Sequence, residues 1–179
     1  VKKMKATGVV RRIDDLGRIV IPKELRRTMR IKEGDSLEIF IDGNERVVLK
    51  KYSPVQNIND FVVEFVESIY SSYKKDIIIT DNETVIAVAG AYKKDLVGKK
   101  ITNSLQEKIS KRATIYTDKT DKIYLTETQT LEKPSVIKPI NVYGDITGCV
   151  IVSSDTDTGE VEKSLAEFGG LFMSRYLEG

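Results

Sequence analysis

Five arginines near the start of the chain are the residues whose chemistry stands out first: Arg11, Arg12, Arg18, Arg26 and Arg27. A guanidinium is always charged and donates hydrogen bonds in a planar fork, which matches phosphate oxygens and the O6 and N7 atoms of guanine. Lys5 and Arg12 are suited to additional phosphate contacts. These residue types therefore predict a site for double-stranded nucleic acid.

An alternative interpretation leaves the same arginines on a solvated surface, paired with acids close to them in the sequence. The acids available for such pairs are Asp14, Asp15 and Glu24. Asp14 and Asp15 also have the residue types of a metal site or an acid–base pair. Their place just before Gly17 favours turn chemistry and the orientation of Arg18 instead.

The charge of the chain is divided unevenly between its two parts. Residues 1–52 hold 14 Lys and Arg against 8 Asp and Glu, whereas residues 53–179 hold 15 against 19. The opening segment thus carries a balance of +6 and the remainder −4. This pattern is typical of a polyanion-binding module joined to a carrier that polyanions do not attract.

The composition excludes most catalytic chemistry. The chain has no histidine and a single cysteine, Cys149. Serine and cysteine triads, imidazole proton shuttles and internal disulfides all need residues that are missing here. We therefore expect no enzyme activity, no metal and no cofactor. Because no stretch approaches the ~20 apolar residues of a membrane span, we also expect a cytoplasmic protein without membrane contact.

Short elements must position the arginines. The pattern predicts strands over residues 7–13 and 18–21 around a turn at Gly17, then a helix over 23–29 introduced by Pro22. A hairpin over residues 37–50 follows, with Asp42-Gly43 at its turn. A segment of this size buries too little apolar area to fold alone, so we expect an obligate dimer of its copies.

The run from Lys5 to Arg27 resembles the swapped-hairpin DNA-binding family of transition-state regulators typified by AbrB. The similarity continues through Gly34-Asp35, Leu37–Phe40 and Leu49–Tyr52. The resemblance implies a swapped-hairpin β-barrel shared between two chains. The positions that match DNA-binding residues of the family are Arg11, Arg18, Arg26 and Arg27. The resemblance also implies AT-rich promoter targets, read through duplex shape more than through a base code.

A second domain is expected over residues 58–179, after a linker at 53–57 that contains Pro54. Apolar residues recur at helical spacing near both of its ends, and several strand-like runs lie between them. We therefore expect an α+β domain in which two long amphipathic helices bracket a meandering antiparallel sheet.

The two-part layout resembles sporulation regulators of spore-forming bacteria, whose second half is GAF-like. The resemblance implies an activator and repressor of sporulation genes, associated with the nucleoid in the forespore, and a homotetramer formed through the C-terminal domains. A pocket for an unknown small ligand would have Tyr92, Lys93 and Lys94 in its wall, and a purely oligomerising role is the open alternative. An antitoxin-type autoregulator is a second alternative, although its disordered acidic tail would lack the amphipathic helices expected here.

Overall fold

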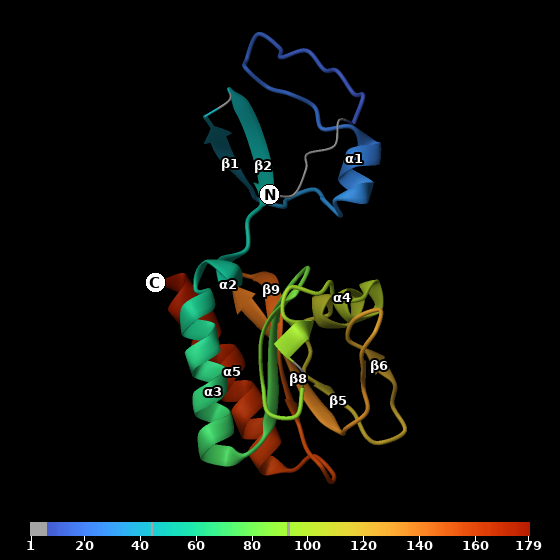
Figure 1. The fold of residues 1–179 in the computed structure, drawn as a ribbon, viewed down its shortest axis with the longest axis vertical. Helices are drawn as coiled ribbons and strands as arrows, with labels where there is room; N and C mark the ends of the chain where they lie inside the picture. The colour runs from blue at the N-terminus through green and yellow to red at the C-terminus, as the bar shows by residue number, and fades with distance from the viewer. Residues whose placement is uncertain (1–6, 44, 93) are drawn as a thin grey trace. The chain divides into compact units, whose positions relative to one another are not determined.

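The computed structural model describes residues 7–43, 45–92 and 94–179 (Figure 1). The chain divides into two compact units, Val1–Tyr52 and Ser53–Gly179. In the described part of the chain, no helix combines the length and the apolar character needed to cross a bilayer.

The described residues of the first unit form one short helix and one hairpin. Helix α1 (Lys23–Thr28) begins directly after Pro22, whose fixed φ suits a helix entry. Strands β1 (Leu37–Asp42) and β2 (Arg46–Lys51) pair antiparallel from Leu37 opposite Lys51 to Asp42 opposite Arg46. The hairpin and the helix predicted from the sequence are therefore present.

The strands expected over residues 7–13 and 18–21 are not formed in the single chain. Backbone hydrogen bonds described for this segment close its turn: the Asp14 N–H donates to the Arg18 carbonyl at 3.0 Å, and the Gly17 N–H to the Asp14 carbonyl at 3.0 Å. Gly17 has a φ of +75°, as a tight turn requires. A strand exists only where a neighbouring strand completes its ladder, and the described residues of this unit supply none to the segment.

The first unit has almost no interior of its own. Among its described residues, Pro22 alone is buried. Large apolar side chains are exposed along the opening segment and on the hairpin, as at Val10 with 85% and Ile41 with 81% of their surface accessible. Exposed apolar surface on this scale is unfavourable in water.

The second unit is built on a five-stranded antiparallel sheet in the order β4-β3-β9-β8-β5. Its strands are β3 (Asp76–Asp81), β4 (Val85–Ala89), β5 (Ile115–Tyr116), β8 (Ser135–Val142) and β9 (Asp145–Ser153). The expected antiparallel sheet is present, but it is not a simple meander because β9 lies between β3 and β8. A separate ribbon pairs β6 (Ile123–Tyr124) with β7 (Thr130–Leu131).

Helices cover both faces of this sheet (Figure 1). On one face lie α3 (Asn59–Tyr73) and α5 (Glu160–Glu178), packed on a core that includes Ile77, Ile79 and Val152. On the other lie η1 (Lys94–Leu96) and α4 (Asn103–Ser110), over a core that includes Ile78 and Ile151. Ile77 and Ile79 of β3 thus serve one core and Ile78 the other, so that the middle of the strand is a continuous apolar run.

The segment expected as a linker, residues 53–57, is instead part of the second unit. It forms helix α2 (Pro54–Asn57), with Ser53 as N-cap accepting a hydrogen bond from the Gln56 N–H. The Ser53 hydroxyl also donates to the Asp81 carboxylate at 2.8 Å, and Val55 is fully buried in the core. The proline and polar residues that resemble a linker are equally suited to a helix start.

Candidate nucleic-acid interface

The two arginines of α1 lie in its last turn and are exposed. Neither the Arg26 nor the Arg27 side chain forms a hydrogen bond or ion pair with any residue that the structure describes. Because consecutive helix residues point about 100° apart, the two guanidinium groups leave the helix in different directions. Both groups are available to a ligand outside the unit.

Arg11 and Arg12 lie on the irregular segment that precedes the turn, and both are exposed. The Arg11 guanidinium donates to the Val10 carbonyl at 3.0 Å, a local contact that leaves its remaining donors free. Arg12 contacts no acid among the residues with described positions. The alternative of local ion pairing with Asp14, Asp15 or Glu24 therefore receives no support at Arg11 and Arg12, whereas Arg18 does form an ion pair with Asp14 at 2.8 Å.

Arg18 is held by the turn that precedes it. Its Nε donates to Oδ2 of Asp14 at 2.8 Å, while Oδ1 of Asp14 accepts the backbone N–H groups of Arg18 at 2.7 Å and Leu16 at 3.0 Å. The hydrogen bonds from the Arg18 backbone and side chain lower the pKa of Asp14. The Arg18 side chain remains 70% exposed. Turn chemistry and the orientation of Arg18, expected from the sequence, are both present.

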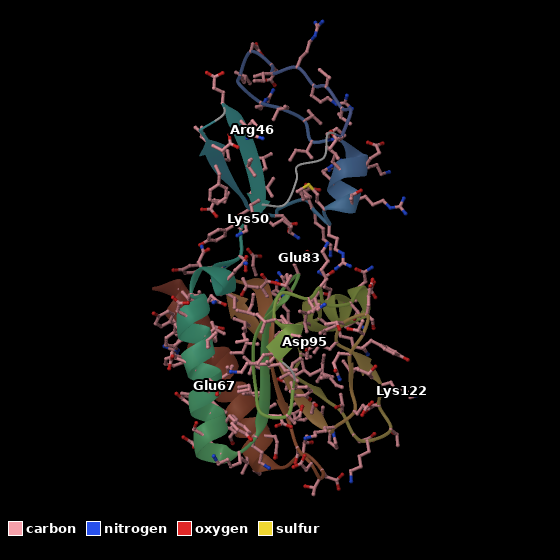
Figure 2. All side chains as sticks on the ribbon, viewed as in Figure 1. Arg46, Lys50, Glu67, Glu83, Asp95 and Lys122 are labelled. Atoms are coloured by element: carbon pink, nitrogen blue, oxygen red, sulfur yellow. The ribbon has the colours of Figure 1, made fainter. Side chains whose placement is uncertain are left out.

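The predicted set also contains Lys5, which lies outside the described residues. Within the unit, β2 carries two further cations that are labelled in Figure 2, Arg46 and Lys50. Arg46 pairs with Asp42 at 3.0 Å, whereas Lys50 is exposed. The residue spacing did not identify the exposed lysines Lys23, Lys32 and Lys50 as candidate DNA contacts. The only sequence signal that pointed to them was the net charge of +6 on residues 1–52, to which they contribute.

The two described residues expected to wall a ligand pocket, Tyr92 and Lys94, have different contacts. The Tyr92 hydroxyl lies 2.6 Å from the Ser153 hydroxyl, and burial raises the pKa of Tyr92. Lys94 is exposed and pairs at 3.3 Å with Glu67, which projects from α3 (Figure 2). Lys93 lies outside the described residues. Neither of the two pockets described below is lined by Tyr92 or Lys94, and a ligand site at these residues stays a prediction.

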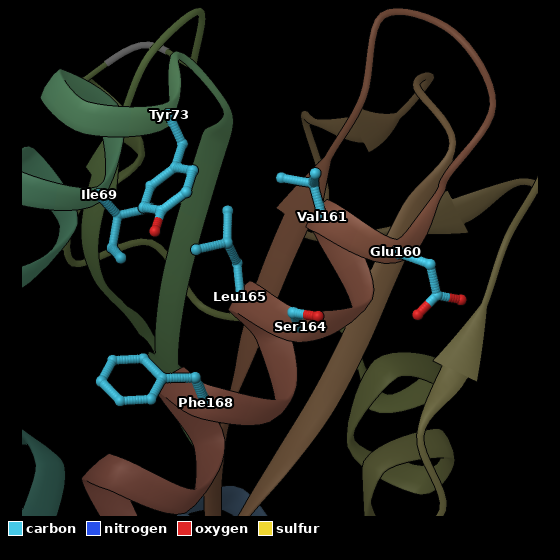
Figure 3. A pocket seen from close by; sticks show the side chains of 7 residues that line it. All are labelled: Ile69, Tyr73, Glu160, Val161, Ser164, Leu165 and Phe168. Carbon is cyan, nitrogen blue, oxygen red and sulfur yellow. The ribbon is translucent and has the colours of Figure 1, made fainter.

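Two pockets of similar size open on α5. A largely apolar one of about 430 Å³ lies between α3 and α5, where Ile69 and Tyr73 face Val161, Leu165 and Phe168 (Figure 3). A polar one of about 500 Å³ has Arg112, Lys138 and Glu167 among its lining residues. The Lys138 ammonium in that second pocket donates to the Thr114 hydroxyl at 3.3 Å.

Aromatic side chains form a continuous layer along α3 and α5. We call this the aromatic face, and its members are Phe61, Phe65, Phe168, Phe172 and Tyr176. The rings of Phe61 and Tyr176 stack at 4.3 Å between centroids. Phe168 is 54% exposed and Tyr176 is 49% exposed. The sequence periodicity identified these helices as amphipathic, but the sheet covers only part of their apolar surface and leaves aromatic side chains such as Phe168 and Tyr176 half exposed.

Cys149 is buried on β9, and its sulfur lies 3.3 Å from the Thr80 hydroxyl. Burial raises the pKa of Cys149 to about 12. The thiolate required for oxidation chemistry is therefore scarce at neutral pH.

Comparisons with known proteins identify relatives of both units. The family profile described as "Stage V sporulation protein T C-terminal, transcription factor" matches residues 57–178. The profile described as "Antidote-toxin recognition MazE, bacterial antitoxin" matches residues 10–57. Stage V sporulation protein T of Bacillus subtilis (strain 168) is 42% identical over 177 residues, which make up 98% of this chain and 99% of the relative.

A further relative and a solved domain structure match the first unit. Transition state regulatory protein AbrB of Bacillus subtilis (strain 168) is 61% identical over 51 residues, 28% of this chain and 52% of AbrB. The solution structure of the N-domain of the transcription factor AbrB is 60% identical and covers 29% of this chain and 98% of that domain, with a TM-score of 0.27. Identity of 42% along almost the whole chain, together with the profile match to its second unit, shows that the chain belongs to the stage V sporulation protein T family of transcription factors.

Proposed function

We propose that the chain regulates sporulation genes by binding promoter DNA through its first unit, as activator and repressor, and that two copies of this unit form one DNA-binding body. The observation that carries the proposal is the exposure of five arginines on a unit whose apolar residues are also exposed. The apolar surface requires a second copy, and the second copy doubles every arginine.

The physical case for the dimer begins with backbone that lacks strand partners and with exposed apolar side chains. Residues 7–21 carry strand-forming sequence without a ladder, and Val10 and Ile41 are among the most exposed apolar residues of the chain. Exchange of hairpins between two copies would supply both the missing strand partners and a shared core. This swapped-hairpin barrel is the arrangement expected from the similarity of residues 5–52 to AbrB.

The physical case for DNA rests on symmetry and on the arginine fork. A two-fold dimer presents its cations in equivalent pairs, which suits the pseudo-symmetric backbone of a duplex. Arg11, Arg18, Arg26 and Arg27 are the proposed base and phosphate contacts, while Lys5 and Arg12 would contact phosphate alone. AT-rich promoter regions, with a narrow minor groove that attracts guanidinium groups, are the proposed targets.

The second unit is proposed to be GAF-like and to join two such dimers into a homotetramer. The aromatic face on α3 and α5 is the surface proposed for this contact, with a second copy of the same face as its occupant. Its half-exposed rings, among them Phe168 and Tyr176, form an apolar patch of the type that pairs of helices bury when they associate. A small ligand that modulates this assembly, with Tyr92, Lys93 and Lys94 at its site, remains part of the proposal. The proposed place of action is the cytoplasm of the forespore, at the nucleoid.

The antitoxin alternative predicts a disordered acidic tail after the DNA-binding unit. The profile match to MazE is confined to residues 10–57 and corresponds to the unit that both classes share. Residues 53–179 instead form a folded unit with two cores, which favours the regulator.

Fluorescence anisotropy on AT-rich promoter duplexes tests the proposal. Arg18→Ala and Arg26→Ala are expected to weaken binding by at least tenfold each, because a two-fold complex loses two contacts. Lys122→Ala is the matched control, since this exposed cation belongs to the second unit (Figure 2). Unchanged affinity in both arginine variants, with thermal unfolding like that of the wild type, would refute the assignment.

A further inference from the structure

The turn before Arg18 contains two adjacent acids that differ in what they contact. Asp14 accepts three hydrogen bonds, from the Leu16 N–H, the Arg18 N–H and the Arg18 Nε. Asp15 is exposed and forms no hydrogen bond or ion pair with any residue in the described ranges. The two carboxylates therefore bring the same charge to the same loop, but only one is bonded to the arginine.

The two oxygens of Asp14 have separate tasks. Oδ1 accepts both backbone N–H groups and so closes the turn, an arrangement typical of an aspartate that initiates one. Oδ2 accepts from Nε of Arg18 at 2.8 Å and so fixes the side chain. The turn that builds the loop therefore also sets the direction of the guanidinium.

The contact at Nε leaves the other edge of the guanidinium open. Arg18 donates to Asp14 through Nε, and no bond from its Nη1 or Nη2 to another described residue is found. The Nη1/Nη2 edge is the pair of donors that binds guanine O6 and N7, or two phosphate oxygens, in bidentate fashion. A side chain that is 70% exposed normally samples many rotamers, and fixing it in the free protein reduces the ordering cost of binding.

We propose that Asp14 is a positioning residue for DNA recognition, which holds Nε of Arg18 so that the Nη edge is presented to the duplex. This inference rests on the proposed DNA-binding function. A carboxylate close to DNA repels phosphate, so its removal ordinarily increases the affinity for DNA. The inference predicts the opposite change in affinity. Removal of the Asp14 charge is expected to weaken binding instead.

The test compares Asp14→Asn with Asp15→Asn, two variants with the same change of charge. Asn at position 14 keeps Oδ1 as acceptor for the turn, but its amide replaces Oδ2 and cannot accept from Nε. Affinities are measured by anisotropy on a duplex selected from a randomised pool by the wild-type chain, and on an unrelated duplex of equal length. Asp14→Asn is expected to weaken binding to the selected duplex by about three- to tenfold. Asp15→Asn is expected to bind both duplexes as well as the wild type or better.

A double-mutant cycle separates positioning from a structural role. In an Arg18→Ala background the loss caused by Asp14→Asn is expected to disappear, because there is no guanidinium left to position. A loss that persists in that background, or equal behaviour of Asp14→Asn and Asp15→Asn, would overturn the inference while wild-type binding still supported the proposed function. Failure of the wild-type chain to bind any duplex at low salt would overturn the proposed function and the inference with it.

Discussion

Substitution of Phe168 by alanine is expected to dissociate the proposed tetramer into dimers. Phe168 lies on the aromatic face and packs against Phe65 and Phe172, with ring centroids 6.4 and 5.6 Å away. It is 54% exposed in the single chain, so roughly half of its surface is left for a second copy to cover. The variant keeps α5 intact, because alanine is the best helix former.

The magnitude follows from the exposed fraction. A phenylalanine presents ~200 Å² of burial surface, so covering the exposed half removes about 100 Å² from water. At ~25 cal/mol per Å² this contributes about 2.5 kcal/mol for each copy. In a two-fold interface the side chain occurs twice, and the loss of about 5 kcal/mol corresponds to a factor of several thousand in the dissociation constant of that interface.

Analytical ultracentrifugation over a range of concentrations measures this constant. The wild type is expected to sediment as a tetramer and Phe168→Ala as a dimer at the same micromolar concentration. Tyr124→Ala is the matched control, because Tyr124 on β6 is an aromatic residue of similar exposure, 53%, outside the aromatic face. A Phe168→Ala protein that remains a tetramer, or an equal loss in Tyr124→Ala, would refute the assignment of this face.

Three further predictions concern the second unit. Burial alone would raise the pKa of Glu162, but hydrogen bonds from Lys75 and from the Gly159 N–H outweigh this effect and lower the pKa to about 2. The ionised carboxylate therefore stabilises the fold above about pH 4.5, and this stabilisation decreases as the pH falls toward 2. Glu162→Gln is therefore expected to cost about 1–3 kcal/mol of unfolding free energy at pH 7 and much less near pH 2, and an equal cost at both values in urea titrations would contradict this cause. Gly148→Ala is expected to destabilise the unit by at least ~2 kcal/mol, because the added Cβ would contact backbone atoms of Thr80 and Asp81, and an unchanged melting temperature would show that the strands can separate there. Cys149 is expected to resist alkylation in the native protein and to react in denaturant, and rapid native labelling followed by mass spectrometry would mean that β9 opens readily.

Local patterns in the sequence were sufficient where the physical cause is local. The Asp42-Gly43 signal identified the β1–β2 hairpin, Pro22 identified the start of α1, and Gly17 identified the turn with positive φ. Long apolar periodicity identified α3 and α5 for the same reason.

Features that depend on distant or external partners were not accessible in the same way. The strands expected at residues 7–13 and 18–21 have the required sequence but find no partner strand in the part of the chain that the structure describes. The place of β9 between β3 and β8 depends on pairing such as that of Ile78 with Ile151, which no local pattern encodes. The expectation of a linker at residues 53–57 was wrong because its proline and polar residues suit a linker and a helix start equally well, and the burial of Val55 and the Ser53–Asp81 hydrogen bond distinguish the two.

The candidate site shows the same division. Composition and spacing singled out the arginines and the role of the turn before Arg18, because these depend on residues a few positions apart. The distinction between Asp14 and Asp15 required coordinates, since the two carboxylates are equivalent in the sequence and only one accepts from the guanidinium. The contacts of Tyr92 with Ser153 and of Lys94 with Glu67 join residues far apart in the sequence, which the spacing of the expected pocket residues did not specify.

The salt dependence of duplex binding tests the central claim most directly, that paired copies of the first unit present a cationic surface to DNA. Anisotropy titrations of the full chain on one promoter duplex, repeated between 50 and 200 mM salt, give the slope of log affinity against log salt. The account predicts a loss of about a thousandfold or more across this range, as expected when at least six phosphates are neutralised at ~0.9 each. An affinity that stays constant across the same range would contradict it.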